Sequence, residues 1–261
     1  MQTNIAERIL TETNDLSGAR DLVDIEGLSS PRVCNLLNRL VAGMAPGEHY
    51  LEIGTWKGRT LLSAAHGNAG RLCIACDKFR FWGKFTGPGF LARRALLRNV
   101  ARHRAGAAQV EFHAMTSREL FRRELVRAPI GVFFYDGDHS YAETRHAVMS
   151  VEPYLSQRSV LVIDDWADPI IVRATHDALR AARLDVLWHR SLPGNHDEEG
   201  FWNGLGVFYI ERHRPSDART PAVLESKSEW TSTSPAWTGT SPARTVAGGA
   251  EQSLQPSVVV R

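Results

Sequence analysis

The chain has 261 residues, 43% of them hydrophobic, which is enough for one mid-sized domain with its own core. Charged residues make up 23% and the formal net charge is +2, so neither disorder throughout nor strong nucleic-acid binding is indicated. No apolar run approaches the roughly 20 residues needed to cross a bilayer. The N-terminal residues lack the apolar core of a signal peptide, so we expect a cytoplasmic protein without membrane contact.

The first clear element is a helix within residues 30–44. Ser30 is placed to cap it, Pro31 suits its first position, and apolar residues recur at helical spacing up to Val41. A shorter apolar stretch, residues 5–10, precedes it. We therefore treat residues 1–46 as an N-terminal helical segment.

A strict alternation of strands and helices follows. The expected strands are residues 49–54, 71–77, 108–115, 130–137 and 159–166, all rich in Val, Ile, Leu and Phe. A helical pattern follows each of them, which is typical of a parallel, doubly wound α/β sheet.

The second of these strands contains a C-x-x-C motif, Cys73 and Cys76. Such a motif can mark a metal or redox site. In a strand, however, side chains three residues apart point to opposite faces, so the pair cannot share a ligand. We expect buried structural thiols.

The end of the folded region differs. Residues 185–192 and 204–213 form two expected strands with only a polar loop between them, so they must pair antiparallel if they are neighbours. The expected fold is thus a doubly wound, mostly parallel, seven-stranded sheet closed by a C-terminal antiparallel hairpin, spanning residues 47–214. Residues 215–261 are rich in Ser, Thr, Pro and Gly without periodicity, which predicts a disordered tail.

A glycine turn ends the first strand in the pattern E-x-G-x-x-x-G, formed by Glu52, Gly54, Thr55 and Gly58. It departs from the G-x-G-x-x-G pattern that cradles a pyrophosphate, so a nicotinamide cofactor is disfavoured. Alone, it could be only a tight strand-to-helix turn. Asp77 ends the second strand about 20 residues later, where an acidic side chain reaches the ribose hydroxyls of a bound nucleoside.

Polar side chains gather where the parallel strands end. Glu52, Gly54, Asp77, Ser117, Asp136 and Asp164 all lie at such ends. Ligands of open α/β sheets bind beyond the carboxyl ends of the strands. We therefore expect one ligand cavity along this edge.

An acidic group is expected within this edge. Asp136, Asp164 and Asp165 follow two neighbouring strands, and crowded carboxylates repel one another unless a cation neutralises them. Oxygen ligands favour Mg²⁺, Mn²⁺ or Ca²⁺ over zinc. His139 lies three residues beyond Asp136 and could face the same cavity. Other acids have simpler roles, because Asp138 (with Ser140) and Asp168 are placed to cap helices.

Residues 25–212 resemble the class I methyltransferase family that includes antibiotic-sugar O-methyltransferases and is related to catechol O-methyltransferase. The resemblance lies in YLEIGTWKGRT, in DKFRFWGKFTGPGFLARRALLRNV, and in YDGDHSYAETRHAV with VLVIDDW. It implies S-adenosylmethionine as cofactor, bound through Glu52, Gly54, Thr55, Gly58, Asp77, Ser117 and Asp136. In the metal-dependent members, the resemblance maps the ligands of a divalent cation, Mg²⁺ by expectation, onto Asp136, Asp164 and Asp165. It maps the general base onto His139, so His139 and Asp136 are the expected catalytic residues.

The expected function is O-methylation of a small hydroxylated molecule, a sugar or a phenolic secondary metabolite. Aromatic loops at residues 79–90 and 193–203 are expected to cover the acceptor, with Trp82, Phe85, Phe201 and Trp202 as walls. A homodimer is possible, and no nucleic-acid partner is expected. Two alternatives stay open: an N- or C-methyltransferase without metal, and a catalytically silent nucleoside-binding module. A hydrolase lacks support, since no G-x-S-x-G motif occurs.

Overall fold

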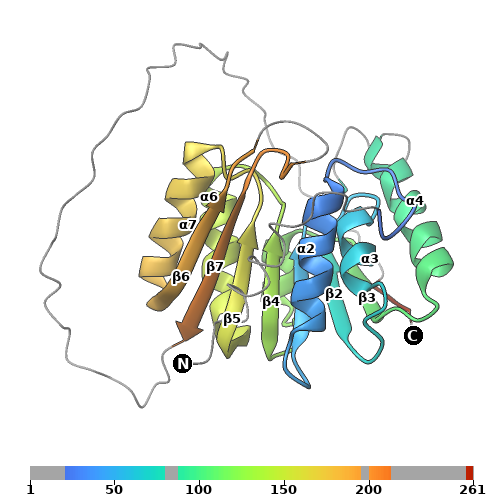
Figure 1. The fold of residues 1–261 in the computed structure, drawn as a ribbon, viewed down its shortest axis with the longest axis horizontal. Helices are drawn as coiled ribbons and strands as arrows, with labels where there is room; N and C mark the ends of the chain where they lie inside the picture. Colours follow the sequence, from blue (N-terminus) through green and yellow to red (C-terminus); the bar gives the residue numbers. More distant parts are fainter. Residues whose placement is uncertain (1–20, 80–87, 195–199, 213–256, 261) are drawn as a thin grey trace, which may run out of the picture. The chain divides into compact units, whose positions relative to one another are not determined.

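The fold is an eight-stranded sheet with helices on both faces (Figure 1). It is taken from a computed structural model, in which residues 21–79, 88–194, 200–212 and 257–260 are described. The strands are β1 (His49–Ile53), β2 (Leu72–Cys76), β3 (Gln109–His113), β4 (Ile130–Tyr135), β5 (Leu155–Ile163), β6 (Leu184–Leu192), β7 (Leu205–Arg212) and β8 (Ser257–Val260). The helices are α2 (Pro31–Ala42), α3 (Arg59–Ala65), α4 (Pro88–His103), α5 (Ser117–Arg122), α6 (Tyr141–Val151) and α7 (Pro169–Ala181), with a short 3-10 helix, η1 (Glu152–Tyr154).

The strand order is β6-β7-β5-β4-β1-β2-β3-β8. The strands β1 to β5 run parallel, because β1 pairs with β2 and β4, β2 with β3, and β4 with β5. The strands β6 and β7 form an antiparallel hairpin, and β7 also lies antiparallel to β5. The doubly wound parallel sheet with its antiparallel closure is thus confirmed.

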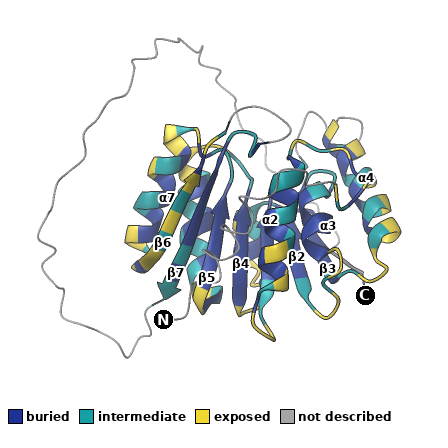
Figure 2. Ribbon diagram, in the orientation of Figure 1, coloured by how far each residue is buried: buried dark blue, intermediate teal, exposed yellow. Residues whose placement is uncertain are grey.

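The sheet has one apolar core on each face. The helices α2, α3 and α4 bury their apolar residues against one face, and α5, α6 and α7 against the other (Figures 1 and 2). Cys73 belongs to the first core and Cys76 to the second, and both thiols are free and buried. They are therefore structural, as their spacing along the strand predicts. Because α2 packs on the sheet, the N-terminal segment shares its core.

Local signals set the helix starts. Ser30 caps α2 and accepts a hydrogen bond from the Val33 N–H at 3.3 Å, with Pro31 at the first helical position. Asp168 caps α7 by accepting from the Ile170 N–H at 2.8 Å. For α6 the cap is Ser140, whereas Asp138 lies two residues earlier and accepts from the Ser140 N–H at 3.1 Å. The expected pairing of Asp138 with Ser140 at this helix start is present, but Ser140 supplies the capping oxygen.

The structure has one strand more than the seven expected. Ser257–Val260 forms β8, which pairs antiparallel with β3 and covers its outer edge. The sequence analysis placed these residues in the disordered tail. The rest of that tail, and the short apolar stretch at residues 5–10, lie outside the described residues. Among the helices described, none has the length and apolar character needed to cross a membrane.

Candidate functional site

A cavity of about 560 Å³ opens at the carboxyl ends of the parallel strands. Most of the expected site residues line this one cavity: Gly54, Thr55, Asp77, Ser117, Asp136, His139, Asp164 and Asp165. Glu52 and Gly58 do not line it. The parallel strands place their ends at one edge of the sheet, which brings together residues as far apart in sequence as Gly54 and Asp165.

The glycine turn is shaped by close packing. Gly54 has φ +91°, and a Cβ there would lie 1.8 Å from the backbone oxygen of Asp136. Gly58 has φ +89°, and a Cβ there would lie 2.5 Å from Leu96 Cδ1. Only glycine therefore fits at either position. Gly54 forms the cavity floor, whereas Gly58 is buried at the start of α3, where it lets α4 approach.

Asp77 holds the glycine turn in place. Its Oδ2 accepts hydrogen bonds from the backbone N–H groups of Thr55 at 3.0 Å and Trp56 at 2.8 Å. Its Oδ1 accepts from the Phe79 N–H at 2.7 Å. The carboxylate thus ties the turn after β1 to the end of β2, while lining the cavity.

Glu52 lies beneath the turn, fully buried. It accepts hydrogen bonds from the Tyr50 hydroxyl at 2.6 Å and the Thr60 hydroxyl at 2.9 Å. Burial raises the pKa of Glu52 to about 8, although both hydrogen bonds act to lower it. Because its side chain is turned into the core, Glu52 supports the turn. It does not line the cavity, where the expected contact with a cofactor would require it.

The acidic cluster lies at the ends of β4 and β5 and lines the same cavity. Burial raises the pKa of Asp136 well above its usual value, and the charges of Asp164 and Asp165 raise it further. Burial, followed by the charge of Asp165, raises the pKa of Asp164 to about 7. The Oδ1 of Asp164 is buried and has no hydrogen-bond partner among the residues that the structure describes. Burial and crowding therefore disfavour the charged forms of Asp136 and Asp164, which a bound cation would stabilise.

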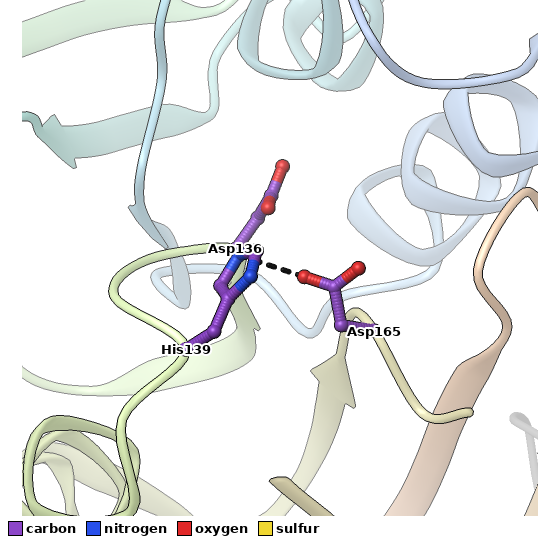
Figure 3. Close-up of side chains that lie close together, drawn as sticks. All are labelled: Asp136, His139 and Asp165. Atoms are coloured by element: carbon purple, nitrogen blue, oxygen red, sulfur yellow. Dashed lines mark ion pairs between the residues drawn. The ribbon is translucent and has the colours of Figure 1, made fainter. Parts of the chain in front are cut away.

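Asp165 and His139 form a close pair. His139 Nε2 and Asp165 Oδ2 are 2.7 Å apart, and Figure 3 shows the carboxylate turned toward the imidazole. The hydrogen bond with Asp165 raises the pKa of His139, against burial that acts to lower it. Burial acts to raise the pKa of Asp165, but hydrogen bonds from His139 and Asn203 outweigh it and hold the pKa below its usual value. With Nε2 engaged, Nδ1 is the nitrogen that can take a proton from a ligand.

A possible cation site lies at the same place. Asp136, His139 and Asp165 each offer an atom, all within 4.8 Å of one another (Figure 3). The expected set was Asp136, Asp164 and Asp165, so the structure gathers His139 in place of Asp164. The carboxylates of Asp136 and Asp165, with the neighbouring Asp164 oxygen that has no partner among the described residues, suit a hard divalent cation. The residues present fit such an ion.

Several cavity residues went unrecognised in the sequence. The segment Gly27–Ser29 lines the cavity, as do Lys78 and Asn203. Asn203 donates a hydrogen bond from Nδ2 to Asp165 Oδ1 at 2.7 Å. Its Asn-Gly dipeptide signals a turn, but nothing local places that turn beside Asp165.

The expected aromatic walls are only partly visible. Trp202 lines the cavity, whereas Phe201 packs against the core on the face covered by α2, α3 and α4. Trp82 and Phe85 lie outside the described residues.

The sheet topology, the glycine turn and the acidic strand ends together define the class I methyltransferase fold. Residues 51–166 match the model of a family described as a methyltransferase domain, a stretch that holds the turn, Asp77 and the whole acidic cluster. Residues 51–166 therefore match a methyltransferase domain, and the sheet that carries them has the class I methyltransferase fold.

Solved structures agree with this fold. An O-methyltransferase from Bacillus cereus, in complex with SAH, is 14% identical with a TM-score of 0.51, covering 81% of this chain and 92% of that chain. TrmN from Thermus thermophilus is also 14% identical with a TM-score of 0.50, covering 80% of this chain and 53% of that chain. At such identity the likeness concerns the fold. Among curated proteins, no match was found.

Proposed function

We propose that this protein transfers the methyl group of S-adenosylmethionine to a hydroxyl oxygen of a small molecule, with His139 as the general base. The observation that carries the proposal is the His139–Asp165 pair, which lines the same cavity as the glycine turn. The pair supplies a proton acceptor within reach of a ligand, and the turn supplies a place for the donor. The solved O-methyltransferase with bound SAH supports the choice of cofactor.

The cofactor side of the cavity is the edge formed by β1, β2 and β3. Gly54 leaves backbone exposed to a ligand, and Asp77 offers a carboxylate toward ribose hydroxyls. Ser117, the first residue of α5, lines the cavity beyond β3. The acidic cluster beyond the turn favours a positively charged sulfonium.

The reaction needs one proton transfer and one displacement. His139 Nδ1 accepts the proton of the acceptor hydroxyl, and the oxygen attacks the methyl carbon as the carbon–sulfur bond breaks. The products are a methyl ether and the neutral thioether S-adenosylhomocysteine. Asp165 stabilises the imidazolium that forms, because its carboxylate lies 2.7 Å from Nε2.

Asp136 and Asp165 would hold a divalent cation, Mg²⁺ by preference, with Asp164 and the base His139 beside it. Such an ion supplies a Lewis acid that lowers the pKa of a bound hydroxyl and fixes its direction. The acceptor class that fits this arrangement is a diol or catechol, whose two adjacent oxygens can face one ion. A sugar diol and a phenolic metabolite both meet this requirement.

The test is methyl transfer from labelled S-adenosylmethionine to catechol and to a panel of sugar diols. We expect an O-methylated product, identified by mass spectrometry, that disappears with chelator and returns with Mg²⁺ or Mn²⁺. Full turnover by metal-stripped protein in excess chelator would remove the cation from the proposal. Products methylated on nitrogen or carbon, obtained with an expanded acceptor panel, would contradict O-methylation.

A further inference from the structure

The side chain of Asn203 lies behind the His139–Asp165 pair, on the turn that leads into β7. We propose that Asn203 is a positioning residue, which fixes the Asp165 carboxylate so that this carboxylate orients the His139 imidazole. The proposal rests on the proposed function, in which His139 is the base.

The Asp165 carboxylate is engaged at both oxygens. Oδ1 accepts from Asn203 Nδ2 at 2.7 Å, and Oδ2 lies 2.7 Å from His139 Nε2. With one oxygen fixed, the carboxylate cannot rotate about its Cβ–Cγ bond without breaking a hydrogen bond. The direction of the second oxygen, and so of the imidazole, follows from the first.

The backbone around Asp165 depends on the same turn. Asp165 has φ +54°, a left-handed conformation that costs a non-glycine residue roughly 1 kcal/mol or more. Two backbone hydrogen bonds dock its loop on the turn: the Trp166 N–H donates to the Gly204 oxygen at 3.1 Å, and the Ala167 N–H to the Asn203 oxygen at 2.9 Å. Asn203 therefore bonds Asp165 through its side chain, and its main-chain oxygen bonds Ala167, two residues further along the same loop.

The turn that carries Asn203 is itself fixed. The Gly204 N–H donates to the Phe201 oxygen at 2.7 Å, and Gly204 has φ +87°. Gly194 packs so closely against the turn that a Cβ there would lie 2.4 Å from the carbonyl carbon of Asn203. From the N-terminal side, the Ser30 hydroxyl donates to the Gly200 oxygen at 2.5 Å. The amide thus projects from a rigid support.

A neutral amide suits this role. A carboxylate can only accept hydrogen bonds, so the NH₂ group of Asn203 must face Asp165. Because the amide carries no charge, it orients the carboxylate without cancelling the negative charge that stabilises the protonated imidazole. An aspartate at the same position would have the same shape but would repel Asp165.

Asn203→Ala and Asn203→Asp test the proposal. We expect kcat for methyl transfer to fall roughly 10–100-fold in Asn203→Ala and at least as far in Asn203→Asp, with the Kd for S-adenosylhomocysteine unchanged. Asn38→Ala is the matched control, because the Asn38 amide bonds the backbone oxygens of Ser63 and His66 at 2.8 and 2.7 Å, on the α2 side of the fold. It should lower Tm and leave kcat intact.

A double-mutant cycle separates positioning from a general loss of structure. If Asn203 acts through Asp165, Asn203→Ala should have no further effect on kcat in an Asp165→Asn background. Independent, additive losses would overturn the proposal, as would kcat within about two-fold of wild type in either single variant.

An activity-independent readout protects the test from failure of the proposed function. Nitrogen NMR of the imidazole, assigned with His139→Gln, should show a fixed Nε2 hydrogen bond in the wild type that is lost in Asn203→Ala. If no acceptor is methylated but this signal changes, the proposed function fails and the positioning contact stands. An unchanged His139 signal in folded Asn203→Ala overturns the inference.

Discussion

The two halves of the cavity hold their carboxylates in opposite ways. In the half that we propose for the cofactor (the cofactor half), formed by the ends of β1, β2 and β3, Asp77 accepts three backbone hydrogen bonds between 2.7 and 3.0 Å. In the half that we propose for the acceptor (the acceptor half), formed by the ends of β4 and β5 and the turn at residues 200–204, Asp164 has a buried oxygen without a partner among the described residues. Burial also raises the pKa of Asp136 there.

The difference separates a preformed site from one that needs a ligand. Asp77 uses its charge to build the turn, so the shape of the cofactor half is set before anything binds. At Asp136 and Asp164, burial and neighbouring charges disfavour the charged carboxylates, and a cation or a positively charged ligand can stabilise them. Changes in the first half should therefore alter shape and stability, and changes in the second should alter chemistry.

Gly54→Ala should have the largest effect, because Gly54 lies where the cofactor half meets the acceptor half. Its Cβ would lie 1.8 Å from the Asp136 backbone oxygen, so β1 and β4 must move apart. We expect loss of S-adenosylhomocysteine binding in calorimetry and a severe drop in Tm. Gly70→Ala is the control, since Gly70 has φ +83° but nothing within 4 Å of the added Cβ. Equal effects of the two would mean that backbone strain, not the contact, matters.

His139→Ala should impair only the acceptor half, by removing the proposed base. Removing a positioned base costs ~10²–10⁴-fold in rate, while the cofactor half should bind S-adenosylhomocysteine as before. Single-turnover rates and calorimetry measure the two effects separately. His66→Ala, at an exposed histidine outside the cavity, is the control. A variant within a few-fold of wild type at neutral pH would leave His139 without a catalytic role.

Asp77→Ala breaks the cofactor half alone. It leaves three backbone N–H groups without their acceptor and removes the carboxylate expected to meet the ribose. We expect the Kd for S-adenosylhomocysteine to rise by about ten-fold or more, given ~1.4 kcal/mol per ten-fold. Asp77→Asn keeps one acceptor oxygen, so its Kd should lie between those of the wild type and Asp77→Ala. An unchanged Kd in the alanine variant would contradict the assignment.

Glu52→Gln should show whether Glu52 supports the turn or contacts the cofactor. Because the pKa of Glu52 is raised to about 8 in the folded protein, its contribution to stability is greatest at low pH and is lost as pH rises toward 8. The amide mimics the uncharged acid, so Tm should exceed that of the wild type at pH 8 to 9 by more than at pH 5. Cofactor affinity should not change. Weaker cofactor binding, without the pH-dependent difference in Tm, would indicate that Glu52 contacts the cofactor.

Removal of residues 255–261 should have the smallest effect. It uncovers the edge of β3, whose backbone pairs with β8. We expect faster amide hydrogen exchange on β3, little change in Tm and no change in cofactor affinity. Protection of β3 that survives the deletion would show that β8 does not cover this edge in solution.

The sequence predicted what local patterns determine. Apolar runs with helical segments between them set β1 to β5, and strand ends set the positions of Asp77, Asp136 and Asp165. Glu52 was misplaced because alternation along a strand does not say which neighbour a polar side chain will find, here Tyr50 and Thr60. The loop at residues 193–203 was expected near the acceptor, but the contact of Asn203 with Asp165 was not predicted, because it depends on backbone hydrogen bonds between two loops, which leave no periodic pattern in the sequence.

One hydroxyl joins the beginning of the fold to its end. The Ser30 hydroxyl oxygen accepts a hydrogen bond from the Val33 N–H, and the same hydroxyl donates to the Gly200 oxygen. This hydroxyl therefore acts as donor and acceptor at once. The start of α2 and the turn bearing Asn203 are thereby mechanically coupled across 170 positions of the chain. Alanine at residue 30 would release both at once. A substitution at the start of α2 should therefore shift the turn that carries Asn203. We expect residues in these two segments to co-vary among related sequences.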